Sequence, residues 1–214
     1  MKAFMALMTG EAILLFARFM TAVRGIWHGI EPVPRQRVYF ANHTSNGDFI
    51  LIWAVLPSYM RAKTRPVAAA DYWLSSKLRA FIGQEVFNAV LIDRRPEDRD
   101  HDPMELIINA VDEGSSLIIF PEGKRNNTEE FLLPFKAGIY NLAQARPDVD
   151  LVPVWIENLN SVMPKGEVIP IPLVCTVTFG EPLDVDKDED KDAFLARASD
   201  ALVKLSETVR RASS

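Results

Sequence analysis

The sequence predicts an α/β protein: a largely parallel sheet covered by helices, with an N-terminal amphipathic helical motif that docks on a membrane. From residue 37 onward, short apolar runs typical of buried strands alternate with longer stretches of helical periodicity. This alternation is typical of parallel strands joined by helices. The first thirty residues differ, because they form an apolar stretch rich in Met, Phe, Leu and Ala that is interrupted by charged residues. We therefore divide the chain into a membrane-interface helical segment, residues 1–30, and an α/β domain, residues 31–214.

The helical segment has two unlike sides. The charged residues Glu11, Arg18 and Arg24 interrupt it too often for a simple membrane-spanning helix, and the basic start of a secretory signal is missing. A helical wheel gathers Gly10, Glu11, Arg18, Thr21, Gly25 and His28 on one side and Met5, Ala12, Phe16 and Phe19 on the other. Such a helix suits the interface of a bilayer, and the alternative is a helix that covers the domain's own core.

The remaining elements follow from apolar periodicity and from stop signals. Strands are predicted at residues 37–41, 65–70, 88–93, 115–120, 149–157 and 172–180, and helices at 49–60, 71–87, 102–114, 135–146 and 192–211. The helix at 102–114 is bounded clearly, since Pro103 stands near its start and Gly114 at its end. The last helix places Phe194, Leu195, Ala198, Leu202, Leu205 and Val209 on one face. It should therefore cover the sheet.

Composition excludes several functional classes. The formal net charge of −5 gives no electrostatic support to a nucleic-acid partner. The single cysteine, Cys175, allows no internal disulfide. The three histidines are scattered, so we expect no metal site, and the charge run 184–192 is interpreted as a solvated loop that starts the last helix. No G-x-S-x-G motif is present, which argues against a hydrolase of that type.

The stretch "ANHTSNGDF", residues 41–49, is the first candidate for chemistry. It places His43 and Asp48 five positions apart, directly after a predicted strand. A neutral imidazole can take a proton from a substrate hydroxyl, and a carboxylate on its other ring nitrogen fixes the tautomer. The alternative is structural: Ser45 and Asp48 also have the spacing of a capping box at a helix start.

Two more motifs follow predicted strands. "FPEGKRN", residues 120–126, contains a turn at Gly123 that presents Lys124 and Arg125 at the edge of the sheet, where ligands of such sheets bind. These cations suit a phosphate, and the alternative is a plain charged turn. "VLIDRR", residues 90–95, offers Arg94 or Arg95 as a further anion contact, unless they only pair with Asp93.

Taken together, the motifs resemble those of the glycerolipid acyltransferases related to lysophosphatidic acid acyltransferase. The family pattern N-H-x-x-x-x-D matches residues 42–48, and F-I-D-R is similar to "LIDR" at 91–94. The pattern F-P-E-G-T-R-S resembles residues 120–126, and a V-P-V-type strand matches residues 151–156. All four blocks occur in the family's order, which makes the combination far more specific than any one block.

The resemblance implies acyl transfer without a covalent acyl-enzyme. His43 is implied to deprotonate the acceptor hydroxyl and Asp48 to orient His43. The acyl donor is implied to be the thioester of acyl-CoA or of acyl-carrier protein, a co-substrate, with no resident cofactor and no metal. The resemblance also implies that Arg94, Glu122, Gly123 and Arg125 hold the acceptor, joined by Lys124, and that Pro153 belongs to the donor or acyl-chain site.

Departures from the family pattern leave the acceptor open. Lys124 stands for the usual Thr, Asn126 for Ser, Asn88 for Gly and Leu91 for Phe. The expected reaction converts 1-acyl-sn-glycerol-3-phosphate to phosphatidic acid. The alternatives are the same chemistry on another lysolipid, such as a lyso-ornithine lipid, and a non-catalytic lipid-binding protein of the same fold. We expect membrane lipids as partners and a peripheral or monotopic position on the cytoplasmic face of a membrane, specifically a bacterial inner membrane.

Overall fold

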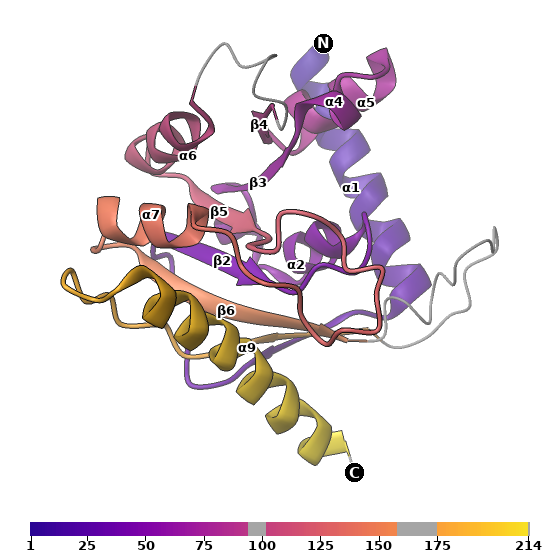
Figure 1. The fold of residues 1–214 in the computed structure, drawn as a ribbon. Helices are drawn as coiled ribbons and strands as arrows, with labels where there is room; N and C mark the ends of the chain where they lie inside the picture. Colours follow the sequence, from indigo (N-terminus) through magenta and orange to yellow (C-terminus); the bar gives the residue numbers. More distant parts are fainter. Residues whose placement is uncertain (94–101, 158–174, 214) are drawn as a thin grey trace.

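A seven-stranded sheet forms the centre of the protein, with helices on both faces (Figure 1). The structure is a computed structural model and describes residues 1–93, 102–157 and 175–213. The strands are β1 (Arg24–Trp27), β2 (Arg37–Ala41), β3 (Thr64–Ala69), β4 (Val90–Ile92), β5 (Ser116–Ile119), β6 (Asp150–Glu157) and β7 (Thr176–Phe179). The helices are α1 (Lys2–Thr21), α2 (Asp48–Val55), α3 (Ser58–Arg61), α4 (Ala70–Trp73), α5 (Lys77–Phe81), α6 (Pro103–Asp112), α7 (Gly138–Ala145) and α9 (Lys191–Ser213).

The strand order is β1-β7-β6-β2-β5-β3-β4. Every neighbouring pair is parallel except β6 and β7, so the predicted, largely parallel α/β sheet is confirmed. The central strand β2 lies between β5 and β6, which means that the loops leaving these strands meet at one edge of the sheet.

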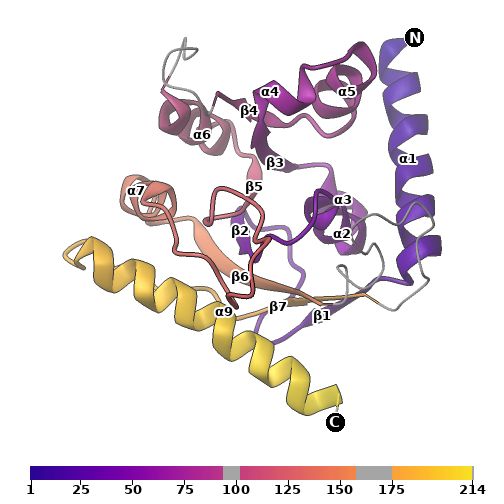
Figure 2. The same cartoon turned by 45° about the vertical axis from the view of Figure 1, so that its right-hand side comes forward.

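Helices lie on both faces of the sheet (Figure 2). An apolar core fills the space between the helices and each face. One core joins α1 and α2 to the side of the sheet that carries Tyr39 and Val152. The other joins α6, α7 and α9 to the side that carries Phe40 and Leu151. The sides alternate along β2 and β6 because successive side chains of a strand point to opposite faces. The predicted inner face of α9 lies in this second core.

The N-terminal helix is shorter than the sequence predicts. Helix α1 ends at Thr21, and residues 24–27 form β1, an edge strand paired with β7. The prediction of one helical segment over residues 1–30 is therefore wrong beyond Thr21, and β1 belongs to the sheet of the α/β domain. Arg24 lies outside the helix, which leaves α1 long and apolar enough to cross a membrane by length and composition alone.

Helix α1 packs on the protein through its small and polar side. Gly10 and Thr21 are buried, and the Arg18 guanidinium donates to the carbonyl of Ala54 in α2 (2.9 Å). The opposite side presents large apolar side chains, of which Phe16 is 63% and Phe19 is 83% exposed. The apolar side of the helical wheel thus faces outward. The predicted polar side is only partly right, because Gly25 and His28 lie beyond the helix, and Glu11 and Arg18 are exposed.

The predicted helix over residues 71–87 is broken into three pieces. Helix α4 ends at Trp73, α5 begins after Ser76, whose hydroxyl accepts from the Arg79 amide (3.3 Å), and residues 82–86 continue as a π-helical turn. The consecutive serines Ser75 and Ser76 favour such a break, because serine side chains bond to nearby backbone groups.

Candidate active site

Two loops carry most of the predicted site to one place, because they leave neighbouring parallel strands. The first runs from Asn42 after β2 to the start of α2, and the second follows β5 through Glu122 to Asn126. The fourth motif is β6 itself, on the other side of β2. The second motif, on β4, lies at the far edge of the sheet.

His43 and Asp48 form a hydrogen-bonded pair. His43 Nδ1 lies 2.9 Å from Asp48 Oδ2, and the Asp48 side chain is fully buried. The imidazole stacks on the Phe120 ring, with 4.2 Å between centroids and 19° between planes. The bond to the carboxylate places the proton on Nδ1, so Nε2 is the nitrogen left to act as a base.

The turn between these residues is organised around one carboxylate oxygen. Asp48 Oδ2 also accepts from the backbone amides of Thr44 (2.7 Å) and Ser45 (2.9 Å). Asp48 Oδ1 is buried and has no hydrogen-bond partner among the described residues. The Ser45 hydroxyl accepts from the Gly47 amide, not from Asp48, so only half of a capping box forms. Asp48 starts the helix and also holds the imidazole.

The buried side chain of Glu122 joins the loop after β5 to the loop after β2. Its Oε1 accepts from the His43 amide (2.8 Å) and its Oε2 from the Leu133 amide (2.9 Å), and the residue is 2% exposed. Burial raises the pKa of this carboxyl above its ordinary value, an effect that the two amides partly offset. Both oxygens are occupied by backbone groups. The implied contact of Glu122 with the acceptor does not fit this placement, in which the carboxylate holds the His43 backbone.

Two asparagines also hold the loop that carries His43, and their contacts are visible only in the folded chain. The Asn126 amide donates to the His43 carbonyl (2.6 Å), so both backbone groups of His43 are held by the second loop. The Asn42 side chain donates to the Ile156 carbonyl (3.1 Å) and accepts from the Ile156 amide (2.9 Å). Asn42 therefore joins the first motif to the fourth. In the sequence, the only indication of this role is that Asn42 directly precedes His43.

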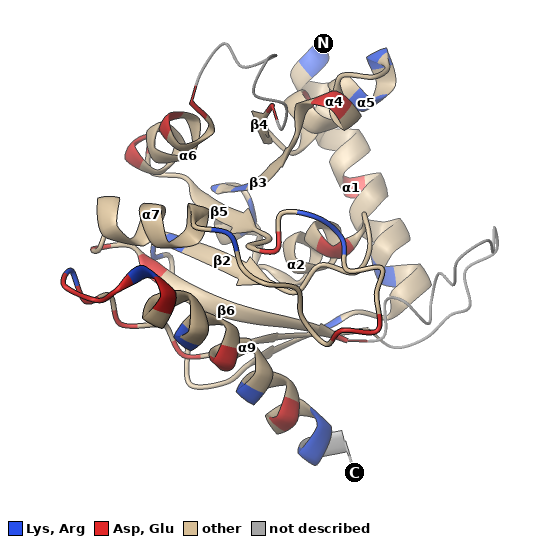
Figure 3. Ribbon diagram, viewed as in Figure 1, with Lys and Arg blue, Asp and Glu red and all other residues tan. Residues whose placement is uncertain are grey.

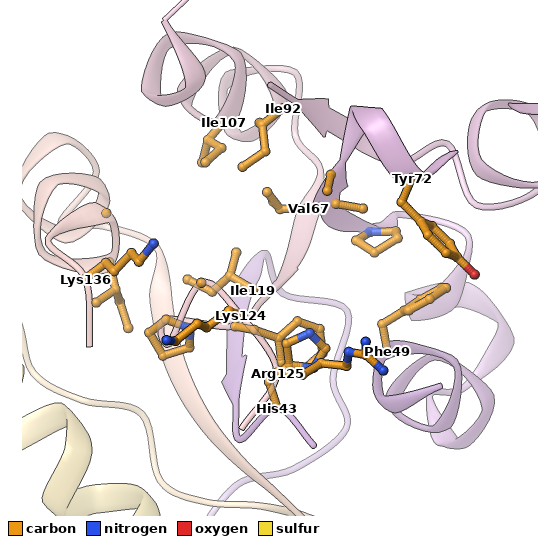
Figure 4. Close-up of a pocket in the computed structure, with 18 of the residues that line it drawn as sticks. His43, Phe49, Val67, Tyr72, Ile92, Ile107, Ile119, Lys124, Arg125 and Lys136 are labelled. Atoms are coloured by element: carbon orange, nitrogen blue, oxygen red, sulfur yellow. The ribbon is translucent and has the colours of Figure 1, made fainter. Parts of the chain in front are cut away.

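His43 lies at the edge of a cavity of about 530 Å³. Figure 4 shows Lys124, Arg125 and Lys136 around the same opening. Among the residues that the structure describes, these three cations line the cavity with no Asp or Glu, although the whole chain carries a net charge of −5. The other end is apolar and lies between β3, β4 and the helices α6 and α7, where Val67, Ile92, Ile107, Ile119, Ile139 and Leu142 line it. The cavity can therefore take an amphiphile with an anionic head.

Of the remaining predicted site residues, some line the cavity and others do not. Gly123 lines the cavity and has φ +68°, a conformation that favours glycine. Pro153 is buried in β6 opposite Phe40 and does not line the cavity, so the implied donor-site role finds no support in its position. Arg94 and Arg95 lie outside the described residues. Lys136 lines the cavity but was not predicted, because it lies ten residues beyond the third motif.

Cys175 is not a candidate nucleophile, although it lies near enough to Asp48 for the charge of that carboxylate to act on its thiol. Cys175 is fully buried, and burial raises the pKa of its thiol to about 11, which leaves it un-ionised and unsuited to act as a nucleophile. No group of three or more His, Cys, Asp or Glu side chains suited to a metal ion occurs in the described part of the chain.

A buried carboxylate, a histidine and a cavity lined by cations meet at the strand ends, an arrangement with the chemistry that proton abstraction beside an anionic ligand requires. The acyltransferase family model matches residues 25–157, which include both loops. The chain therefore belongs to the acyltransferase family, and the membership predicted from the four motifs is confirmed.

Two relatives and one solved structure are similar to this chain. The chain is 29% identical over 157 residues to a 1-acyl-sn-glycerol-3-phosphate acyltransferase of Cocos nucifera, covering 72% of this chain and 48% of that protein. It is 28% identical over 156 residues to Tafazzin of Drosophila melanogaster, covering 70% and 40%. The chain thus spans less than half of the length of these relatives. The crystal structure of the 1-acyl-sn-glycerophosphate (LPA) acyltransferase PlsC from Thermotoga maritima is similar in fold, with a TM-score of 0.70, 20% identity, and coverage of 94% of this chain and 79% of that one.

Proposed function

We propose that this protein is an O-acyltransferase that moves a fatty acyl group from a thioester donor, acyl-CoA or acyl-carrier protein, to the free hydroxyl of a lysophospholipid. We propose 1-acyl-sn-glycerol-3-phosphate as the acceptor and phosphatidic acid as the product. One observation carries the proposal: His43, held by a buried carboxylate, stands at the edge of a cavity with three cations and an apolar end.

The first step is proton abstraction. His43 Nε2 takes the proton of the acceptor hydroxyl while the hydroxyl oxygen attacks the thioester carbonyl. The imidazole becomes positively charged beside Asp48, whose buried carboxylate lies 2.9 Å from Nδ1. Because the Asp48 charge is shielded from water, its attraction for the imidazolium is strong and favours the charged transition state.

The second step returns the proton. The tetrahedral intermediate collapses, the carbon–sulfur bond breaks, and the thiolate leaving group takes the proton from His43 Nε2. The products are an ester and a free thiol, and His43 is neutral again. No enzyme nucleophile is needed, which agrees with the raised pKa of Cys175.

We also propose that the apolar side of α1 docks on a membrane. Phe4, Met5, Leu7, Met8, Leu15, Phe16 and Phe19 are all more than half exposed on this helix. Single exposed apolar side chains are common on protein surfaces, but a row of seven along one helix is a binding surface. Substrate and product are amphiphiles, so an enzyme at the membrane surface avoids drawing them into water.

Activity on a set of acceptors tests the proposed reaction. Purified protein should release free CoA from palmitoyl-CoA only when a lysolipid is added, fastest with 1-acyl-sn-glycerol-3-phosphate, and the product should be phosphatidic acid by mass spectrometry. Faster turnover of a lyso-ornithine lipid or another lysophospholipid would change the acceptor and keep the chemistry. Binding of lysolipid with no CoA release from any pair would overturn the reaction in favour of a lipid-binding protein.

Liposome co-sedimentation tests the docking surface. The double variant Phe16→Ser/Phe19→Ser should sediment with liposomes much less than the unaltered protein. Val33→Ser, which removes an exposed apolar side chain outside α1, is the matched control and should sediment normally. Equal sedimentation of all three proteins would show that α1 does not dock.

A further inference from the structure

We propose that Lys136 is a specificity-determining residue of the acceptor site, and that it selects a dianionic phosphomonoester over a monoanionic phosphodiester. This inference rests on the proposed function and deepens it. Lys136 lies outside the four sequence motifs, and it reaches the cavity from the stretch that leads into α7 (Figure 4).

The backbone fixes the position of Lys136. Its amide donates to the Pro121 carbonyl (2.8 Å), and three residues earlier the Leu133 amide donates to Glu122 Oε2 (2.9 Å). The loop from Glu122 to Lys136 therefore leaves the end of β5, and these two hydrogen bonds tie its far end back to that point. Lys136 is a surface lysine by exposure, but its backbone is anchored to the turn that carries the other two cations.

Gly123 provides the path for the Lys136 side chain. A Cβ atom on Gly123 would lie 2.8 Å from both Cδ and Cε of Lys136 and 3.0 Å from Nζ. The lysine thus crosses directly over the glycine of the third motif, on its way to the side of the cavity where Lys124 and Arg125 lie. The absence of a side chain at residue 123 is what lets three cations gather around one turn.

The three cations are available to bind a ligand of opposite charge. Within the part of the chain that the structure describes, no ion pair or hydrogen bond joins the side chains of Lys124, Arg125 or Lys136 to another residue. Figure 3 shows basic residues on the loop after β5 and just before α7. A concave site that carries only one sign of charge focuses its field on an oppositely charged ligand.

The start of α7 adds to this field. Gly138, its first residue, lines the cavity, and the N-cap Ala137 has no side chain that could accept from the first amides of the helix. Free amides and the helix dipole favour an anion at such an end. A phosphomonoester carries about −1.5 to −2 at pH 7, and a phosphodiester carries only about −1. The added cation therefore benefits the monoester more.

Binding of an inert analogue tests Lys136 without turnover. The ligands are a 1-acyl-propanediol phosphate, which lacks the reacting hydroxyl, and its methyl phosphodiester, with Kd measured by calorimetry in detergent. For Lys136→Gln we expect the Kd of the monoester to rise about tenfold at pH 8, and that of the diester about two- to threefold. Lys136→Arg should restore most of the loss. Lys187→Gln, the same charge change on an exposed loop, should leave both Kd values unchanged.

The pH dependence separates charge recognition from a general loss of structure. The second proton of a phosphomonoester binds with a pKa near 6, so the loss caused by Lys136→Gln should shrink towards the diester value at pH 5.5. Equal losses for both ligands, an equal loss in Lys187→Gln, or a rise only in the KM for acyl-CoA would overturn the assignment. If the unaltered protein binds the analogue selectively but transfers no acyl group, the proposed reaction fails and the role of Lys136 stands.

Discussion

The two sides of the cavity are built in opposite ways. On the catalytic side, hydrogen bonds from two loops hold both backbone groups of His43 and its Nδ1, and the partners Asp48 and Glu122 are buried. On the cationic side, Lys124, Arg125 and Lys136 are exposed long side chains on an anchored backbone.

The difference follows from what each side must do. Proton transfer needs a base held within a few tenths of an ångström, and buried hydrogen bonds provide this before any ligand arrives. Charge recognition tolerates movement, because the attraction between ions changes slowly with distance, and the ligand itself orders the side chains. Substitutions on the catalytic side should therefore change kcat, and those on the cationic side should change KM.

His43→Ala should have the largest effect, since it removes the proposed base and keeps the hydrogen bonds of the residue's backbone. We expect kcat to fall by about 10²- to 10⁴-fold, with circular dichroism and acceptor binding unchanged. The His43 backbone makes its two hydrogen bonds through N and O, so alanine retains them. The variant His28→Ala, which alters an exposed histidine outside the cavity, is the control. Wild-type turnover by His43→Ala would show that the base is elsewhere.

Asp48→Asn should have the second-largest effect, a fall in kcat of about 10²-fold. The amide keeps the volume of the carboxylate, and its oxygen can still accept from the Thr44 and Ser45 amides. It cannot stabilise an imidazolium as a carboxylate does. The acceptor KM should stay within about twofold, because Asp48 does not line the cavity. A change confined to KM would contradict the separation of the two sides.

The motifs at strand ends made much of this site predictable from the sequence. His43, Asp48, Lys124 and Arg125 could be placed at one edge because parallel strands bring their following loops together. The role of Glu122 could not be predicted, since a carboxylate in a charged turn looks alike whether it faces a ligand or two buried amides. Lys136 was missed for a related reason: its place depends on a loop that is closed by contacts with Pro121 and Glu122.

Prediction of the fold from the sequence failed, as for the site, where the structure depends on contacts between distant residues. Periodicity located most helices and strands, because their apolar faces are local patterns. Strand β1 was missed, since "RGIW" is apolar enough to continue the preceding helix and becomes a strand only by pairing with β7, more than 140 residues later. Such a pairing leaves no trace in the short stretch itself.

Arg125→Ala should raise the acceptor KM by about 10- to 100-fold, with kcat within about threefold of the unaltered protein. Arg125 lines the cavity and carries a guanidinium that can bind a phosphate through two N–H groups. Steady-state kinetics at saturating acyl-CoA measures this effect. Arg125→Lys should recover only part of the affinity, because a lysine offers a point charge. A fall in kcat at an unchanged KM would place Arg125 on the catalytic side.

Glu122→Gln should have the smallest effect on turnover, a fall of a few-fold in kcat, because it acts on His43 only through the backbone. Glutamine has one acceptor oxygen, so either the His43 or the Leu133 amide loses its partner, and the free energy of unfolding should fall by about 1–3 kcal/mol. Glu130→Gln, an exposed glutamate on the same loop, is the matched control and should not change stability.

The pH dependence of this loss follows from the raised pKa of Glu122. Since burial raises that pKa above 4.5, the folded protein binds more protons than the unfolded chain from about pH 4.5 upward, and the free energy of unfolding falls as pH rises through this window. Glutamine does not titrate, so the variant lacks this decline. The stability difference between the two proteins should be largest near pH 4 and decrease towards neutral pH, as followed by urea unfolding. A difference that grows with pH would mean that Glu122 is stabilised as the anion, and the buried-carboxyl account of the catalytic frame would fail.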